Sequence, residues 1–235
     1  MKIAITGGSG GIGSALIALL LADAKVEYIY ATFHSTRPQQ SHPKLRWHEV
    51  DLSQEASIES WLDGIEELDW LINAAGILHT ESHGPEKTIR RLDAEYFLRN
   101  VQVNTLPMLL LAKHGFNKFR HGRPGIFASI SARVGSIEEN YLGGWYSYRC
   151  SKAALNMGIK TLSIEWKRSL PNVVVAAVHP GTTDTNLSKP FQRNVPEEQL
   201  FSPEYTASTI ISVLRSLGTE DSGNFWSFDG TRLPW

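Results

Sequence analysis

The sequence lacks the features that mark secreted, disulfide-linked and membrane proteins. Its one cysteine, Cys150, cannot form an intrachain disulfide, so the fold suits a reducing compartment. The longest apolar run, Ala15–Ala22, is far too short to cross a bilayer. The first apolar stretch, Ile3–Ile5, runs straight into glycines, and no signal peptide is expected. These absences predict a cytoplasmic protein with no membrane partner.

An excess of charge of one sign is also absent. The chain carries 23 Lys and Arg residues against 24 Asp and Glu residues, which gives a formal net charge of -1. Such a balance provides no field that would attract nucleic acid or an anionic membrane surface. Hydrophobic residues make up 42% and charged residues 20%, values that are typical of a globular protein. We therefore expect a small-molecule partner and no nucleic acid.

No internal repeat or Pro/Ser-rich linker divides the chain, and strand-like runs alternate with helical ones. The expected strands are Lys2–Thr6, Tyr28–Phe33, Leu45–Val50, Trp70–Ala74, Gly125–Ser129, Asn172–Val178 and Asn224–Phe228. Helical periodicity lies between them, as at Ser14–Ala22 and Ala153–Leu170. This alternation predicts βαβ units. We therefore predict an α/β fold in which residues 1–235 form a single doubly wound Rossmann-type domain, with a mostly parallel seven-stranded sheet flanked by helices.

A glycine-rich turn, Thr6–Gly13, joins the first predicted strand to the first helix. Glycine lets the backbone approach a pyrophosphate closely, and the helix N-terminus attracts the phosphate charge. A flexible turn without a ligand is the alternative, but the strand before and the helix after favour dinucleotide binding. The candidate contacts from this turn are Gly7, Ser9, Gly11, Ile12 and Gly13.

The end of the second predicted strand has no carboxylate. An NAD site usually places an acidic residue there to bind the ribose 2′-hydroxyl, but Ile29–Arg37 contains neither Asp nor Glu. Thr32, His34 and Arg37 are instead suited to donate to a 2′-phosphate, unless His34 and Arg37 are only solvated loop residues. This pattern predicts NADP(H), with NAD(H) as the less favoured cofactor.

Two further strand ends offer contacts to a cofactor. Small residues after a strand let a flat ring or a ribose lie on the backbone, and a carboxylate at Asp51 is suited to accept from the adenine amino group. Each of these features is also ordinary turn chemistry. The candidates are Asp51, Leu52, Asn73, Ala74, Ala75 and Gly76.

A tyrosine and a lysine stand four residues apart at the start of a strongly helical stretch. This spacing places Tyr148 and Lys152 on one helix face, one turn from each other. A nearby ammonium favours phenolate and is expected to lower the pKa of the tyrosine from about 10 toward the working pH. Tyr148 is therefore a candidate general acid for carbonyl reduction and a candidate base for the reverse reaction. A chance spacing among seven tyrosines is the alternative.

These motifs, in this order, resemble the short-chain dehydrogenase/reductase family over nearly the whole chain. They are the TGxxxGxG turn at Thr6–Gly13, the NAAG at Asn73–Gly76, Asn104, Ser131, the YxxxK at Tyr148–Lys152, the turn at Pro180–Gly181 and the pair Asp229–Gly230. The stretches Ser131–Ile137 and Gly143–Tyr148 are similar to the C-factor and sniffer-like carbonyl reductase subgroup.

The resemblance implies a role for each catalytic candidate. Tyr148 would exchange a proton with the substrate oxygen, and Lys152 would hold the nicotinamide ribose and keep the phenol acidic. Asn104 would anchor a water that links Lys152 to a proton relay. Ser131 would hydrogen-bond the substrate oxygen. Many family members carry paired serines here, so Ser129 is the reserve candidate, and another alignment puts Ala132 in the serine's place.

The resemblance also implies contacts and an assembly. Pro180, Gly181, Thr182 and Thr185 would border the nicotinamide and the phosphates. The segment 186–201 is expected to cover the substrate, and a homodimer or homotetramer is expected to form through helices around Asn104 and Tyr148. The activity implied is hydride transfer between NADP(H) and a carbonyl or alcohol. A dinucleotide-binding signalling or regulatory protein, C-factor-like and with slow or vestigial turnover, is the alternative.

Two histidines, His79 and His83, follow the NAAG turn within a His-Thr-Glu-Ser-His loop. A zinc site needs a fuller set of fixed ligands than this loop supplies. We expect no metal, and we expect the loop to form a rim of the substrate pocket.

Overall fold

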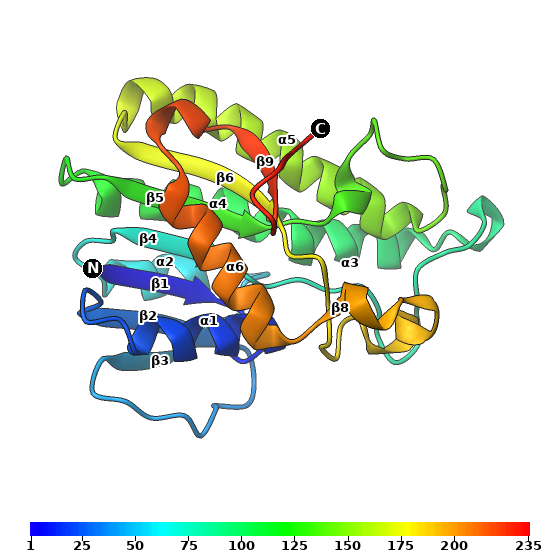
Figure 1. The fold of residues 1–235 in the computed structure, drawn as a ribbon, viewed down its shortest axis with the longest axis horizontal. Coiled ribbons are helices and arrows are strands. Elements are labelled where there is room, and N and C mark those ends of the chain that lie inside the picture. The colour runs from blue at the N-terminus through cyan, green and yellow to red at the C-terminus, as the bar shows by residue number, and fades with distance from the viewer.

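A computed structural model describes residues 1–235, the side chain of Asn194 excepted. Its main sheet has eight strands in the order β10-β9-β6-β5-β4-β1-β2-β3 (Figure 1). These strands are β1 (Lys2–Thr6), β2 (Tyr28–Phe33), β3 (Leu45–Glu49), β4 (Trp70–Asn73), β5 (Gly125–Ile130), β6 (Val173–His179), β9 (Asn224–Ser227) and β10 (Arg232–Leu233). The predicted doubly wound α/β fold is thereby confirmed.

The sheet has one strand more than the sequence predicted. β10 pairs antiparallel with β9 at the sheet edge, whereas the other neighbours in the sheet are parallel. The turn before it uses Gly230, whose φ is +83°. The prediction of seven strands was wrong because a two-residue strand is too short to show period-two alternation.

Helices cover both faces of this sheet. They are α1 (Gly11–Leu21), α2 (Glu55–Asp63), α3 (Ala94–Asn104), α4 (Leu106–Gly115), α5 (Tyr146–Ser169) and α6 (Pro203–Ser216). One core packs α1 and α6 against the sheet, and the other packs α2, α4 and α5 against the opposite face (Figure 1). β6 contributes alternate side chains to both cores, which explains its continuous apolar run.

Two helices begin earlier than their periodicity suggested. α1 begins at Gly11, inside the glycine-rich turn, although glycine is a poor helix former. α5 begins at Tyr146, so Tyr148 lies in its first turn. The first turns of these helices contain polar residues or glycine, so they lack the apolar periodicity that identifies the rest of each helix. Both helix starts therefore fall on residues of the candidate site.

The strand order reverses beside β1. From β1 the chain builds outward to β2 and β3 on one side, and from β4 it builds outward to β5 and β6 on the other. Thr6 is in register with Asn73 where β1 and β4 end. Ligands of open α/β sheets bind at such a switch point, beyond the carboxyl ends of the strands. The fold therefore places the glycine-rich turn and the NAAG turn side by side there.

The structure contains no candidate membrane span. Among its described residues, no helix combines the length and the apolar character that a bilayer crossing requires.

Candidate active site

The glycine-rich turn leaves almost no room for side chains, as its glycines show. A Cβ at Gly7, whose φ is +68°, would lie 2.7 Å from the Ala75 nitrogen. A Cβ at Gly13 would lie 2.2 Å from the Gly7 oxygen, and one at Gly11 would lie 2.5 Å from Thr185 Cγ2. Gly10 gives α1 no side-chain cap, and the first turn of α1 has no acidic residue. The turn therefore presents bare backbone at a helix N-terminus, as a pyrophosphate requires.

The three residues predicted to bind the 2′-phosphate differ in their exposure at the end of β2. Thr32 is buried, its hydroxyl accepts from the Gly7 amide at 3.3 Å, and its carbonyl accepts from the Gly8 amide at 2.9 Å. The structure thus places Thr32 beneath the glycine-rich turn and does not present it to a phosphate. His34 and Arg37 are exposed beyond the strand end. They remain the candidates for a 2′-phosphate.

Asp51 lies close to this region. Its Oδ1 accepts from the Ser53 amide at 2.9 Å and from the Ser53 hydroxyl at 2.7 Å. These hydrogen bonds lower the pKa of the Asp51 carboxyl, and the nearby His34 and Arg99 charges lower it further. Asp51 and the neighbouring Leu52 are both partly exposed, so they are accessible from the strand ends.

The NAAG turn connects the dinucleotide end of the site to the catalytic candidates. Asn73 Oδ1 accepts from the Thr6 hydroxyl at 2.7 Å and from the Ala75 amide at 3.3 Å, which ties β4 to β1. A Cβ at Gly76 would lie 3.1 Å from Asn104 Oδ1 and 3.5 Å from Lys152 Nζ. The turn therefore brings Asn104 and Lys152 to one place.

Asn104 is fully buried at the end of α3, and both polar atoms of its side chain are hydrogen-bonded to protein groups. Oδ1 accepts from the Ile77 amide at 2.7 Å, while Nδ2 is 2.9 Å from the Ile77 oxygen and 3.0 Å from Ser151 Oγ. These contacts join α3, the NAAG loop and α5. The water that Asn104 is expected to anchor stays a prediction.

Tyr148 and Lys152 are neighbours in the buried first turns of α5. They are 8% and 3% exposed, and Lys152 Nζ lies 5.8 Å from the centroid of the Tyr148 ring. Lys152 Nζ donates to the Ile130 oxygen at 3.0 Å. Burial lowers the pKa of Lys152 to about 8. Burial, together with the nearby Tyr96, raises the pKa of Tyr148.

The pKa of Tyr148 thus shifts in the direction opposite to the sequence-based prediction, which was wrong. Desolvation disfavours charge on both groups, and it has the largest effect on the pKa of each. The ammonium is also directed to the Ile130 carbonyl. Spacing along a helix revealed the pairing of the two side chains but carried no information about their burial.

The serine candidates lie at the end of β5. Ser131 is buried, and its hydroxyl donates to Asn156 Oδ1 at 2.6 Å. Ser129 is also buried, and its hydroxyl has no hydrogen-bond partner among the described residues. Ala132, the third possibility, is partly exposed. Of the two hydroxyls, that of Ser131 is nearer the carboxyl end of β5, and it is already engaged.

The turn after β6 borders the glycine-rich turn and leads into the expected covering segment. Gly181 has a φ of +74°, and a Cβ there would lie 2.7 Å from the Phe201 ring. Thr182 belongs to β7 (Thr182–Thr183), which pairs with β8 (Leu200–Phe201). Thr185 touches the glycine-rich turn at Gly11. Pro180, Gly181, Thr182 and Thr185 therefore lie along the path from the glycine-rich turn to the segment 186–201.

The segment 186–201 packs against His79 and Trp145. His79 Nε2 lies 3.1 Å from the Asn186 oxygen, and the Phe191 ring packs against His79 and Trp145 at centroid distances of 5.8 and 5.3 Å. Trp145 also packs edge-on against Tyr148, at 6.3 Å. Among the described residues, no group of three His, Cys, Asp or Glu side chains is arranged to hold a metal.

Sequence reasoning missed two residues near Tyr148, namely Trp145 and Glu86. Trp145 is the one residue other than glycine with a positive φ among those described, at 54°. The preceding Gly143–Gly144 pair hinted at an unusual backbone there. Glu86 is a buried carboxylate in a loop of no recognisable pattern. No periodicity in the sequence distinguishes it from the exposed glutamates.

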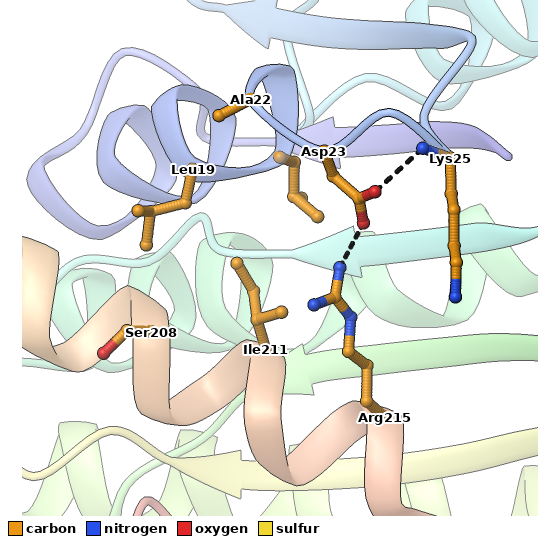
Figure 2. A pocket seen from close by; sticks show the side chains of 8 residues that line it. Leu19, Ala22, Asp23, Lys25, Ser208, Ile211 and Arg215 are labelled. Atoms are coloured by element: carbon orange, nitrogen blue, oxygen red, sulfur yellow. Dashed lines mark hydrogen bonds and ion pairs between the residues drawn. The ribbon is translucent and has the colours of Figure 1, made fainter.

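A surface pocket lies elsewhere, between α1 and α6. Its lining residues are Leu19, Leu20, Ala22, Asp23, Lys25, Ser208, Ile211 and Arg215 (Figure 2). Asp23 accepts there from the Lys25 amide at 2.8 Å and pairs with Arg215. This pocket adjoins the carboxyl end of α1, whereas the glycine-rich turn lies at its amino end. It is therefore separate from the site around Tyr148.

Comparison with known sequences identifies relatives of this chain. Residues 1–196 match the short chain dehydrogenase family. The 1-hydroxy-2-glutathionyl-2-methyl-3-butene dehydrogenase of Rhodococcus sp. (strain AD45) is 33% identical over 191 residues, which cover 79% of this chain and 78% of that protein. The C-signal protein of Myxococcus xanthus is 30% identical over 168 residues, which cover 72% of this chain and 93% of that protein.

Solved structures share the fold over the full length of the chain. Carbonyl reductase Sniffer of D. melanogaster superposes with a TM-score of 0.86 at 25% identity, covering 100% of this chain and 99% of that one. The NADPH-bound carbonyl reductase from chicken fatty liver superposes with a TM-score of 0.88 at 25% identity, covering 100% and 94%. The ordered motifs, the fold and these matches agree, and the chain belongs to the short-chain dehydrogenase/reductase family of oxidoreductases.

Proposed function

We propose that this enzyme reduces a carbonyl compound with NADPH, or oxidises an alcohol with NADP in the reverse direction. The observation that carries the proposal is the convergence of the Tyr148–Lys152 pair, Asn104 and Gly76 beyond the strand ends, beside the glycine-rich turn. A proton donor and a dinucleotide cradle are thereby adjacent. Carbonyl reduction needs both groups in one place.

The residues of the cradle fit a dinucleotide. Gly7, Gly11 and Gly13 leave backbone where a Cβ would collide with the chain, and the NAAG turn forms the opposing wall. The exposed side chains of His34 and Arg37, together with the lack of any Asp or Glu within Ile29–Arg37, support NADP(H) over NAD(H). The NADPH carried by the similar chicken carbonyl reductase supports the same choice.

When bound, the nicotinamide supplies or accepts the hydride. Tyr148 donates its phenolic proton to the substrate oxygen as that oxygen gains charge, and it takes the proton back in alcohol oxidation. Lys152, as an ammonium, stabilises the phenolate that results. Its Nζ would exchange the Ile130 carbonyl for ribose hydroxyls, and Asn104 would return protons to it through water.

Ser131 is proposed to assist by hydrogen-bonding the substrate oxygen. The Ser131 hydroxyl must first give up its hydrogen bond to Asn156 Oδ1, whereas the Tyr148 hydroxyl donates to no described protein group. The net contribution of Ser131 is therefore smaller than that of Tyr148. The segment 186–201 would exclude water by folding over Trp145 and Tyr148.

The test of this function is turnover with a defined cofactor preference. Purified enzyme is expected to consume NADPH in the presence of at least one member of a panel of aldehydes, ketones and quinones, and to bind NADPH at least tenfold more tightly than NADH. Arg37→Asp is expected to remove most of the preference for NADPH over NADH, because a carboxylate repels the 2′-phosphate. Equal affinity for the two cofactors would overturn the assignment of NADP(H).

The glycine cradle is tested by Gly13→Ala. The added Cβ would meet the Gly7 carbonyl at 2.2 Å, so the turn must open and NADPH affinity is expected to fall at least a hundredfold. Fluorescence titration measures the affinity, and circular dichroism reports whether the variant is folded. Gly84→Ala is the matched control, since nothing lies within 4 Å of a Cβ at that glycine. A folded Gly13→Ala protein that binds NADPH normally would contradict the cradle.

The similarity to C-signal supports a second candidate function, a regulatory protein that binds a dinucleotide with little turnover. The two functions separate experimentally. A wild-type protein that binds NADPH, reduces nothing in the panel and keeps its cellular effect when Tyr148 is replaced would favour regulation. We further propose that residues 1–235 act as one domain. A cytoplasmic location and a homodimer or homotetramer stay predictions.

A further inference from the structure

Glu86 is a carboxylate with an unusual setting. It is 4% exposed in the loop between the NAAG turn and α3, and it forms no ion pair among the described residues. An isolated charge is costly to bury without strong hydrogen bonds. The partners of Glu86 therefore indicate why the side chain is there.

Those partners belong to the first turn of the helix that carries Tyr148. Glu86 Oε2 accepts from the Ser147 amide at 3.1 Å, and Oε1 accepts a short hydrogen bond from the Ser147 hydroxyl. The backbone oxygen of Glu86 accepts from the Trp145 amide at 2.5 Å. α5 has no side-chain cap at Trp145 and no acidic residue of its own in its first turn. Glu86 thus supplies from another loop the negative charge that a helix N-terminus favours.

The backbone that Glu86 holds is otherwise unfavourable. Gly143, Gly144 and Trp145 have φ values of +62°, +66° and +54°, three left-handed residues in succession. The Trp145 side chain makes this conformation costly, and such strain persists only where surrounding contacts enforce it. A Cβ at Gly144 would lie 3.3 Å from the Glu86 oxygen, so the loop packs directly against the turn.

We infer that Glu86 is a positioning residue for Tyr148. By fixing the Ser147 amide and hydroxyl and the Trp145 amide, it sets where α5 begins, and with it the place of the Tyr148 phenol. It also holds the Trp145 ring between Tyr148 and Phe191, under the segment 186–201. This inference rests on the proposed function in that Tyr148 is the proton donor.

The test compares Glu86→Ala and Glu86→Gln with Glu81→Gln, an exposed carboxylate of the same loop. Glu86→Ala is expected to lower kcat at least tenfold while the Kd for NADPH changes less than twofold, because the dinucleotide cradle is not touched. Glu86→Gln keeps one acceptor for Ser147 and is expected to recover part of the loss. The double variant Ser147→Ala with Glu86→Ala should raise the activation free energy by less than the sum of the increases in the two single variants, because both changes break the same contact. Glu81→Gln should match the wild type.

Hydrogen exchange provides a readout that needs no turnover. Amides of residues 145–149 are expected to exchange at least tenfold faster in Glu86→Ala, with exchange in the β1–α1 region unchanged. The inference would be overturned if kcat were unchanged in an active Glu86→Ala enzyme. It would also be overturned if kcat and NADPH affinity fell to the same extent in both Glu86 variants. If the wild type reduces no carbonyl, the proposed function fails, while unchanged exchange at 145–149 would by itself refute the positioning role.

Discussion

Tyr148→Phe is expected to lower the turnover of carbonyl reduction about a thousandfold and to leave the Kd for NADPH within about twofold of the wild type. The change deletes one oxygen and removes the proton donor, and general acid catalysis contributes roughly 100- to 10,000-fold. The phenyl ring keeps the edge-on contact with Trp145. Among the described residues, no protein group is hydrogen-bonded to the Tyr148 hydroxyl, so the fold loses little.

The measurement is the rate of NADPH oxidation with the best substrate of the carbonyl panel, alongside a titration of cofactor binding. Tyr146→Phe is the matched control, because Tyr146 begins the same helix and is more exposed. It should keep nearly full turnover. A Tyr148→Phe enzyme with more than a tenth of the wild-type turnover would show that another group donates the proton.

Lys152→Met is expected to lower turnover at least a hundredfold and to make the cofactor-free protein more stable at pH 7. Burial holds the pKa of Lys152 at about 8, against the usual 10.5. A shift of that size corresponds to about 3 kcal/mol of destabilisation at neutral pH. Replacing the ammonium removes this penalty, but it also removes the hydrogen bond to the Ile130 carbonyl, which offsets about 1 to 2 kcal/mol of the stability gained. The net gain of about 1 to 2 kcal/mol should therefore raise the melting temperature by roughly 2 to 8 °C.

The pH dependence of this stabilisation has a definite sign. Since the pKa of Lys152 is lower in the folded state, the unfolded chain binds the extra proton between about pH 8 and pH 10.5. The wild type therefore gains stability from this group as the pH rises through that window, and the advantage of Lys152→Met shrinks. Thermal melts at pH 7 and pH 10 measure the difference. A variant that melts below the wild type at pH 7 would mean that burial does not penalise the ammonium.

The sequence was sufficient for the parts of the site that local pattern controls. The glycine-rich turn, the NAAG turn and the Tyr148–Lys152 pair follow from the demands of close backbone approach and of helical spacing. The strand ends place them together because parallel strands share one carboxyl edge. The seven predicted strands were found within one or two residues, since most of them alternate or run apolar over at least four positions.

The rest depended on packing between distant segments. Thr32 looks like a phosphate ligand in sequence, but its place in register within β2 turns it under the glycine-rich turn. The pKa of Tyr148 depends on desolvation by loops that no helical spacing encodes. Glu86 meets Ser147 across 61 residues of chain. Such pairings need the three-dimensional contact before their chemistry can be recognised.

The strand order has a consequence for how the protein acquires its cofactor site. The two turns that we propose enclose the dinucleotide follow β1 and β4. The register of these strands pairs Thr6 with Asn73 across a long stretch of intervening chain. Pairings between distant positions close slowly, because a large loop must lose its conformational entropy before any contact forms. β1 therefore keeps one edge unpaired until β4 packs against it. Before that pairing only half of the proposed cradle exists, so NADPH is expected to stabilise the later folding steps and not the earliest ones.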